Sequence, residues 1–211
     1  SFQMGGVESP SGSSASLTYA DAQAIADPRN VPDAAIVAPE FTGNTQVIFG
    51  SANINTKVTG ATPEYLTAFG MEVDRGRFIT EGDVSGRGAV AVLGSAAARD
   101  LFGGFDPIGQ KIKVAMPGAG GGRVSLTVIG ILSPQGGSRF SDPDNAVIVP
   151  ITTAQTKLFD GRNAQGESVV TSVNVVVTKG LNDNEINDFI AWTKNEPVHV
   201  RFIEFMPFSG N

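Results

Sequence analysis

The sequence predicts an α+β fold in which short strands and short helices are joined by tight turns. Apolar runs such as 90–93 and 124–132 have the length and flanking turn residues of β-strands. Between such runs lie segments that begin at Thr or Ser and carry apolar residues at helical spacing. The chain also contains 26 glycines among 211 residues, which favours short turns.

The N-terminal third is predicted to contain one helix and several strands. Thr18 is placed to begin the helix, and Asp21 follows three residues later, as a capping box requires. The apolar face of this helix would be formed by Ala22, Ile25 and Ala26. Strands are predicted over 34–38, 45–49 and 54–58, with a turn at 50–53.

Two further helices are predicted in the middle of the chain. Thr62 followed by Pro63 predicts an N-cap and a first helical residue, where the missing N–H of proline has no consequence. Ser95 is predicted to cap the next helix, which ends before Gly103.

The segment after residue 105 is predicted to be mainly strand. Gly109 permits a positive φ in the turn that precedes the first of these strands. The glycine-rich stretch 118–122 lacks the Lys-Ser/Thr of a phosphate-binding loop, so we interpret it as the tip of a hairpin. Pro150 would lead into a helix that ends near Phe159. Strands are predicted over 111–114, 124–132 and 146–149.

Residues 172–204 are predicted to form a β–α–β unit that is an integral part of the fold. Asn182 would cap its helix, with Glu185 as the capping-box partner. The buried stripe of that helix would be Ile186, Phe189 and Ile190. The flanking strands are expected to be parallel, with a right-handed crossover.

The composition excludes several classes of function. A formal net charge of −6 argues against a nucleic-acid-binding protein, which would need a basic face. The absence of cysteine excludes disulfides, iron–sulfur clusters and thiolate zinc sites. No run reaches the roughly 18 apolar residues that a membrane-spanning helix needs, and we expect no signal peptide in this sequence.

No catalytic, cofactor-binding or metal-binding residue is predicted. Arg77 and Asp83 could be taken for a polar site, but an ion pair or turn contact is the favoured interpretation. Asp142 and Asp144 could hold a hard cation together with nearby carbonyls, although a turn is favoured here too. His199, the single histidine, alternates with valines and is interpreted as solvent-facing or structural.

Five motifs occur in order over residues 58–112. They are V-x-G-x-x-P-x-Y at 58–65, G-R-F-I-x-x-x-D at 76–83, V-A-V-L-G at 90–94, L-F-G at 101–103 and D-P-I-G-x-x-I at 106–112. Each motif alone is weak, but five in register are specific. Their order and spacing resemble the extracytoplasmic core domain of MacB-type ABC transporter permeases, a superfamily that includes lipoprotein-release and FtsX-like relatives. The resemblance covers about residues 15–170.

The resemblance implies a two-lobed α+β fold. An α/β lobe of βαβ units, similar to a porter subdomain, would comprise 17–74 and 169–205. A mostly-β lobe, residues 75–168, would be inserted between its two parts. Residues 1–16 would be a flexible N-terminal segment and 206–211 a tail.

The resemblance also implies a function. The chain would be a non-catalytic extracytoplasmic domain, periplasmic or at the cell surface, between the first two membrane helices of a permease. It would transmit conformational change or contact substrate and an adaptor protein during export. Its partners would be the rest of the permease and an ATPase subunit or domain, with no cofactor and no nucleic acid. The full transporter is expected to be a dimer and the isolated domain a monomer.

The C-terminal segment has a second resemblance. Stretches 174–186 and 200–211, the latter containing R-F-I-E-F-M-P-F-x-G-N, resemble a βαβ piece of MoaA-type radical S-adenosylmethionine enzymes of molybdenum-cofactor synthesis. That family's chemistry needs a C-x-x-x-C-x-x-C cluster motif, so its activity does not carry over to a chain without cysteine. Arg201 and Glu204 match motif positions and are interpreted as structural. The alternative function is an inactive fragment or chimera related to that enzyme.

Overall fold

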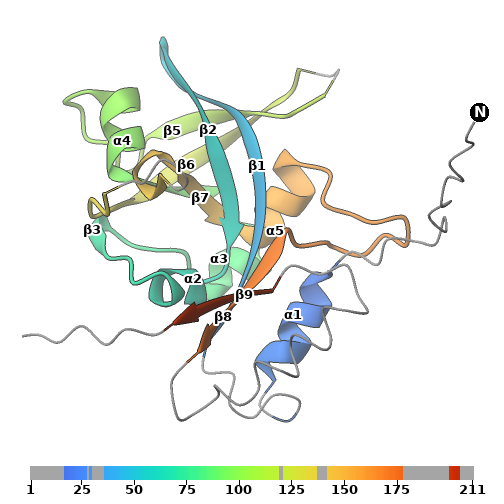
Figure 1. Cartoon of the computed structure of the whole chain (residues 1–211). Coiled ribbons are helices and arrows are strands. Elements are labelled where there is room, and N and C mark those ends of the chain that lie inside the picture. Colours follow the sequence, from blue (N-terminus) through green and yellow to red (C-terminus); the bar gives the residue numbers. More distant parts are fainter. Residues whose placement is uncertain are drawn as a thin grey trace, which may run out of the picture.

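The structure is a computed structural model that describes residues 17–27, 29, 36–118, 121–136, 142–177 and 200–204, with backbone alone at 177 and 200–204. Nine strands of these residues form one sheet, and short helices pack at its surface, which confirms the predicted α+β class (Figure 1).

The strands are β1 (Val37–Phe49), β2 (Ala52–Ala61), β3 (Val73–Gly76), β4 (Val90–Leu93), β5 (Lys111–Ala115), β6 (Arg123–Leu132), β7 (Val147–Pro150), β8 (Ser172–Val177) and β9 (Val200–Glu204). The helices are α1 (Tyr19–Ala26), α2 (Glu64–Ala68), α3 (Glu81–Ser85), α4 (Ser95–Phe102) and α5 (Ile151–Thr153). A 3-10 turn, η1 (Pro143–Asn145), and a π-helical turn, η2 (Ala154–Leu158), complete the elements of the described ranges.

Six of these strands close into a ring, in the order β1–β2–β7–β4–β6–β5 and back to β1. The pairs β2–β7 and β4–β6 are parallel, and the other four are antiparallel. Apolar side chains at alternate strand positions, including Val47, Ile112, Val114, Leu126 and Val128, are completely buried. The ring is therefore a small barrel with a packed interior.

β1 joins this ring to the remainder of the sheet. Its first residues, Val37–Glu40, pair with β8, and the following residues pair with β2. Near its end, Val47 and Ile48 pair with β5. The β1–β2 turn and the group of α1, β8 and β9 consequently lie at opposite ends of the molecule (Figure 1).

The division of the chain into two lobes remains a prediction. β1 and β2 belong to the 17–74 segment, and β4 to β7 belong to the 75–168 segment. Hydrogen bonds between β2 and β7 and between β1 and β5 cross the proposed boundary. The sheet is thus continuous between the segments assigned to different lobes.

The predicted capping box of the first helix is confirmed. The Asp21 amide donates to the Thr18 hydroxyl at 3.1 Å, and the Thr18 amide donates to the Asp21 carboxylate at 2.8 Å. Ala22 and Ile25 are buried as expected, whereas Ala26, the last residue of α1, is exposed.

Two other predicted helix caps are wrong. The Thr62 hydroxyl is buried and makes no hydrogen bond among the described residues, because Pro63 is already helical and takes the cap position. At α4 the cap residue is Gly94, and Ser95 is the first helical residue. The backbone stays extended from β4 through Gly94. Ser95 is therefore the first helical residue and cannot act as the cap.

β1 is also longer than the sequence predicts. The break expected between 34–38 and 45–49 is absent, because Val37–Phe49 forms one strand of 13 residues. Pro39, Gly43 and Asn44 have low β-propensity, but pairing with β8 and β2 overrides it. A Cβ at Gly43 would lie 2.4 Å from the Phe159 ring, so a side chain here would have to displace that ring.

At the C-terminal end, β8 and β9 confirm the predicted parallel pair, with Val173 opposite Val200 and Val177 opposite Glu204. The helix predicted between them, with Asn182, Glu185 and the stripe containing Phe189, lies outside the described residues. His199, the segment 1–16 and the tail 206–211 also lie outside them.

Candidate functional site

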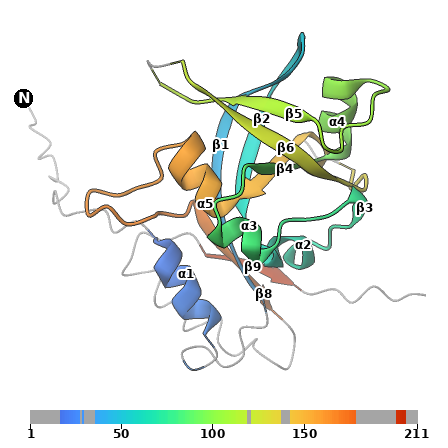
Figure 2. The same ribbon diagram turned by 180° about the vertical axis from the view of Figure 1, so that it is seen from behind.

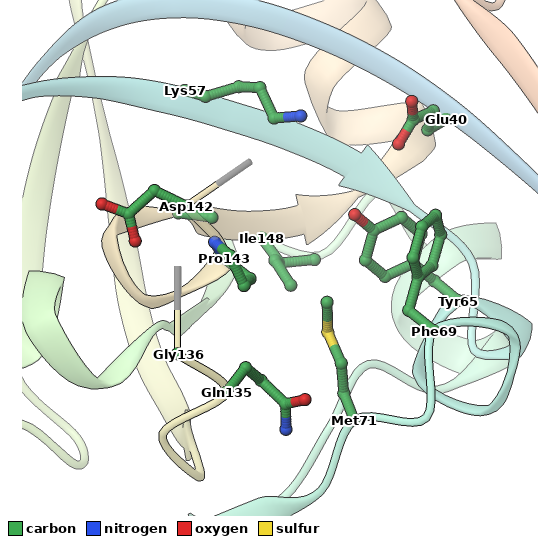
Figure 3. Close-up of a pocket in the computed structure, with 11 residues that line it drawn as sticks. Glu40, Lys57, Tyr65, Phe69, Met71, Gln135, Gly136, Asp142, Pro143 and Ile148 are labelled. Atoms are coloured by element: carbon green, nitrogen blue, oxygen red, sulfur yellow. The ribbon is translucent and has the colours of Figure 1, made fainter. Parts of the chain in front are cut away.

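A pocket of about 310 Å³ lies beside the β1–β2 ribbon, at the small end of the range of ligand sites (Figure 3). It is lined by Glu40, Lys57, Tyr65, Phe69, Met71, Gln135, Gly136, Asp142, Pro143, Ala146 and Ile148. These residues come from β1, β2, α2, β7 and the loops around η1, so only the folded chain brings them together.

One wall of the pocket is apolar. Tyr65 and Phe69 are four residues apart on and just after α2, and their ring centroids are 4.4 Å apart. Figure 3 shows Met71 and Ile148 facing the same space as these rings. Ile148 is buried on β7, so this wall is part of the core.

A second part of the pocket wall carries charged side chains. Glu40 is only 3% exposed, and its Oε1 accepts a hydrogen bond from the Ser172 hydroxyl at 2.7 Å. Lys57 is exposed at the rim, and its ammonium lies on the side of the pocket where Glu40 is found (Figure 3). The wall can therefore interact with polar groups of either sign, beside an apolar surface.

Asp142 and Asp144 are confirmed as turn residues. The Asp142 carboxylate accepts from the Asn145 amide at 3.3 Å and from the Asn145 side chain. The Asp144 carboxylate accepts from the amides of Gln135 and Gly136 at 2.9 and 3.0 Å, which fixes the loop at the pocket edge. No group of three or more metal-ligating side chains is found among the residues that the structure describes.

Arg77 and Asp83 form the predicted ion pair, away from the pocket. Arg77 Nη1 lies 2.6 Å from Asp83 Oδ2, and Nη2 lies 3.1 Å from Oδ1. The same carboxylate accepts from the Thr80 amide at 2.9 Å and completes the capping box of α3. The Arg77 hydrogen bonds are the main reason that the pKa of Asp83 falls from 3.8 to about 2.

This depressed pKa predicts an acid-side loss of stability. Because the folded-state pKa of Asp83 lies below its unfolded value, its contribution is present above about pH 4 and is lost as the pH falls towards 2. Asp83→Asn should lower the free energy of unfolding by about 1 kcal/mol at pH 7, through loss of the ion pair and weakening of the cap. The unfolding free energy of this variant should also fall less as the pH is lowered than that of the wild type. Urea unfolding at a series of acidic pH values measures this loss, which we call the acid limb.

The matched control is Arg75→Gln, which removes the exposed ion pair of Arg75 with Asp106. Because that ion pair caps no helix, Arg75→Gln should lower the free energy of unfolding by less than Asp83→Asn does. The acid limb should persist in this variant. Equal acid limbs in wild type and Asp83→Asn would contradict the assignment.

Sequence reasoning did not find the pocket. Tyr65 lies in the first of the five motifs, but nothing in the sequence connects it with Glu40 or Lys57. For Arg201 and Glu204 only the backbone is described, in β9, so their structural role stays a prediction. Among the described helices, none combines the length and apolar character needed to cross a membrane.

Comparison with known proteins gives consistent matches. The model of the MacB-like periplasmic core domain family matches residues 2–190. The chain is 30% identical over 194 residues to the macrolide export ATP-binding/permease protein MacB of Bdellovibrio bacteriovorus, covering 92% of the chain and 28% of that protein. It is 34% identical over 156 residues to MacB of Rhodospirillum rubrum, covering 72% and 22% respectively. It is also 29% identical over 143 residues to the pyoverdine export protein PvdT of Pseudomonas syringae, covering 67% and 21%.

The chain thus spans about a quarter of the length of the curated relatives it matches. The family match continues to residue 190, into the segment that resembles MoaA-type enzymes. These matches favour the permease over the enzyme-fragment alternative.

Solved structures show the same fold. The extracellular domain of the transporter YknZ from Gram-positive bacteria aligns with a TM-score of 0.63 at 18% identity, covering 85% of this chain and 84% of that one. The periplasmic region of MacB from Actinobacillus actinomycetemcomitans aligns with a TM-score of 0.64 at 18% identity, covering 86% and 75%. The chain belongs to the MacB-like periplasmic core domains, the extracytoplasmic part of ABC transporter permeases.

Proposed function

We propose that this chain is a non-catalytic domain that transmits conformational change across the extracytoplasmic part of an export permease. The observation that carries the proposal is the continuity of β1. At about 3.3 Å per residue, its 13 residues span about 40 Å. The strand is hydrogen-bonded to β8 at one end and to the barrel at the other.

Packing around β1 supports transmission as a rigid body. Ten consecutive residue pairs, from Glu40–Ala61 to Phe49–Ala52, join β1 to β2. Phe159, which follows the helical segment after β7, packs against this ribbon. The centroids of the Phe159 and Phe41 rings are 6.2 Å apart. A displacement at the β8–β9 end would be passed to the barrel through β1, because closely packed elements transmit strain to their neighbours.

The relatives support the proposed partners. MacB and PvdT are described as ATP-binding/permease proteins for macrolide and pyoverdine export. We infer that this chain serves an exporter of that kind, with membrane helices and an ATPase subunit or domain as partners. An adaptor protein and dimerisation in the full transporter belong to the same proposal, as does a monomeric isolated domain.

We expect the purified chain neither to bind nor to hydrolyse ATP, because it lacks the G-x-x-x-x-G-K-S/T loop that cradles phosphates. In the parent transporter, replacing residues 17–204 by a Gly/Ser linker should abolish export while the ATPase part still hydrolyses ATP. A control with two glycines added at the exposed Gly50–Ser51 turn leaves the β1 ladder intact and should export normally.

Each outcome bears on a separate part of the proposal. Export by the linker variant would remove the transmission role. ATP hydrolysis by the pure chain would remove the non-catalytic assignment. Loss of export in the turn control would show that the outer end of the hairpin has a role beyond rigid transmission.

A further inference from the structure

A second pocket, of about 340 Å³, is lined by residues of α1, of the start of β1 and of the beginnings of α2 and α3. These three helices lie at the end of the molecule where β8 and β9 are found, in both views (Figures 1 and 2). We call this cavity the α1 pocket, and it shares no lining residue with the pocket of Figure 3. Its described lining residues are Tyr19, Ala22, Gln23, Ala26, Ile36, Val37, Pro39, Thr62, Glu64 and Glu81.

Two carboxylates without a counter-charge line the α1 pocket. No Lys or Arg is found among its described lining residues, and the ion pairs of the described part of the chain do not include Glu64 or Glu81. The capping boxes of α1 and α3 use Asp21 and Asp83 instead, so neither Glu64 nor Glu81 is engaged in a cap. The pocket therefore has a negative charge that the described residues do not neutralise.

Two hydroxyl-bearing residues complete the polar part of the α1 pocket. Burial, and then the charges of Glu81 and Glu64, raise the pKa of Tyr19, so its phenol lies within electrostatic reach of both carboxylates and stays protonated at neutral pH. Thr62 is only 3% exposed, and its buried hydroxyl has no hydrogen-bond partner among the described residues. An unpartnered buried hydroxyl costs free energy, which a hydrogen-bond donor bound in the pocket would recover.

The rest of the α1 pocket is mainly aliphatic. Half of the ten described lining residues share this character: Ala22, Ala26, Ile36, Val37 and Pro39. A ligand that uses the whole surface therefore needs both a positive group and an aliphatic body. A metal ion has no such body and needs several oxygen ligands, whereas no group of three or more metal-ligating side chains occurs within the described ranges.

We propose that the α1 pocket binds a small aliphatic primary amine in its ammonium form. An ammonium group has three N–H donors and no acceptor, which suits a wall whose polar groups are carboxylates and hydroxyls. Glu64 and Glu81 supply the counter-charge, the Thr62 hydroxyl accepts a hydrogen bond, and the aliphatic chain of the ligand covers Ile36 and Val37. This binding site does not depend on the transmission role proposed above.

The test is calorimetric titration of n-hexylamine hydrochloride into the full chain at pH 7 and low ionic strength. The amine should bind more tightly than 1-hexanol, which has the chain without the charge, and than methylamine, which has the charge without the chain. The variant E64Q/E81Q should weaken binding of n-hexylamine by about tenfold or more, because two charge-assisted hydrogen bonds are lost. Thr62→Val should also weaken it, while leaving the thermal midpoint unchanged or higher, because it removes an unpartnered buried hydroxyl.

The matched control is E72Q/D160N, which changes the net charge equally at exposed positions that do not line the α1 pocket. It should leave the affinity for n-hexylamine unchanged. Glu64 and Glu81 each lie in the first turn of a helix, where an acidic residue also stabilises the helix, so thermal unfolding of both double variants accompanies the titrations. The series of ligands on the wild-type chain tests the need for charge without any substitution.

Three results would overturn the proposal. The first is that n-hexylamine does not bind the wild-type chain, or binds no better than 1-hexanol does. The second is that E72Q/D160N weakens binding as much as E64Q/E81Q does. The third is that Ca²⁺ or a trilysine peptide binds more tightly than n-hexylamine and loses affinity in E64Q/E81Q, which would identify a metal site or a protein-binding site instead.

Discussion

Replacing Gly94 with alanine is expected to destabilise the domain by about 3 kcal/mol, the upper part of the range for overpacked sites. A Cβ at this position would lie 2.3 Å from the Asp144 carbonyl oxygen and 2.4 Å from that of Pro143. Both are backbone atoms of η1, so no side-chain rotation can relieve the contact. The backbone of Gly94 has φ −65° and ψ 157°, which alanine tolerates, so the loss comes from the contact alone.

Urea unfolding of Gly94→Ala beside Gly104→Ala measures this effect. A Cβ at Gly104 would meet nothing within 4 Å, so the control should be neutral or slightly stabilising. Equal unfolding midpoints for the two variants would contradict the steric explanation. The expected difference also gives a physical reason for the glycine that ends the V-A-V-L-G motif, because β4 must pass against η1 at this point.

Leu126→Ala is expected to have a comparable or larger effect, about 3–4 kcal/mol, because it creates a cavity in a closed ring that cannot collapse easily. Leu126 is completely buried on β6, opposite Ile112 of β5. The matched control is Val124→Ala on the same strand, where the side chain is only partly buried. Chemical denaturation should show a loss for Leu126→Ala at least twice that for Val124→Ala, and similar losses would mean that the barrel interior is not tightly packed.

Local signals in the sequence were sufficient for much of the secondary structure. The Thr18–Asp21 box predicts the start of α1, and it forms as predicted. The alternation of polar and apolar residues predicts β5 correctly. Gly109 adopts the expected positive φ, with a value of 80°. In these places the determining interactions lie within a few residues of one another, so pattern and propensity are informative.

Non-local interactions explain what sequence reasoning missed. Gly43 lies within a strand because β1 pairs with β2 there, and the ring of the distant Phe159 occupies the space where a side chain would be. The pocket could not be predicted either, since Glu40 and Ser172, which meet at its charged wall, are 132 positions apart in the chain. No local sequence pattern predicts this contact, because it forms only when β1 pairs with β8.

The closed ring of strands also determines the order in which the domain can fold. The β1–β2 and β5–β6 hairpins are local and can form early, but Val58 finds its partner Val147 only after a large intervening segment has been made. Non-local pairing of this kind slows folding, because the entropy cost of closing a long loop comes before the favourable contacts form. Until β7 is available, one edge of β2 is open to pairing with other chains. A chain that is translocated from its N-terminal side therefore gains protection against misassociation only when residues 147–150 have crossed.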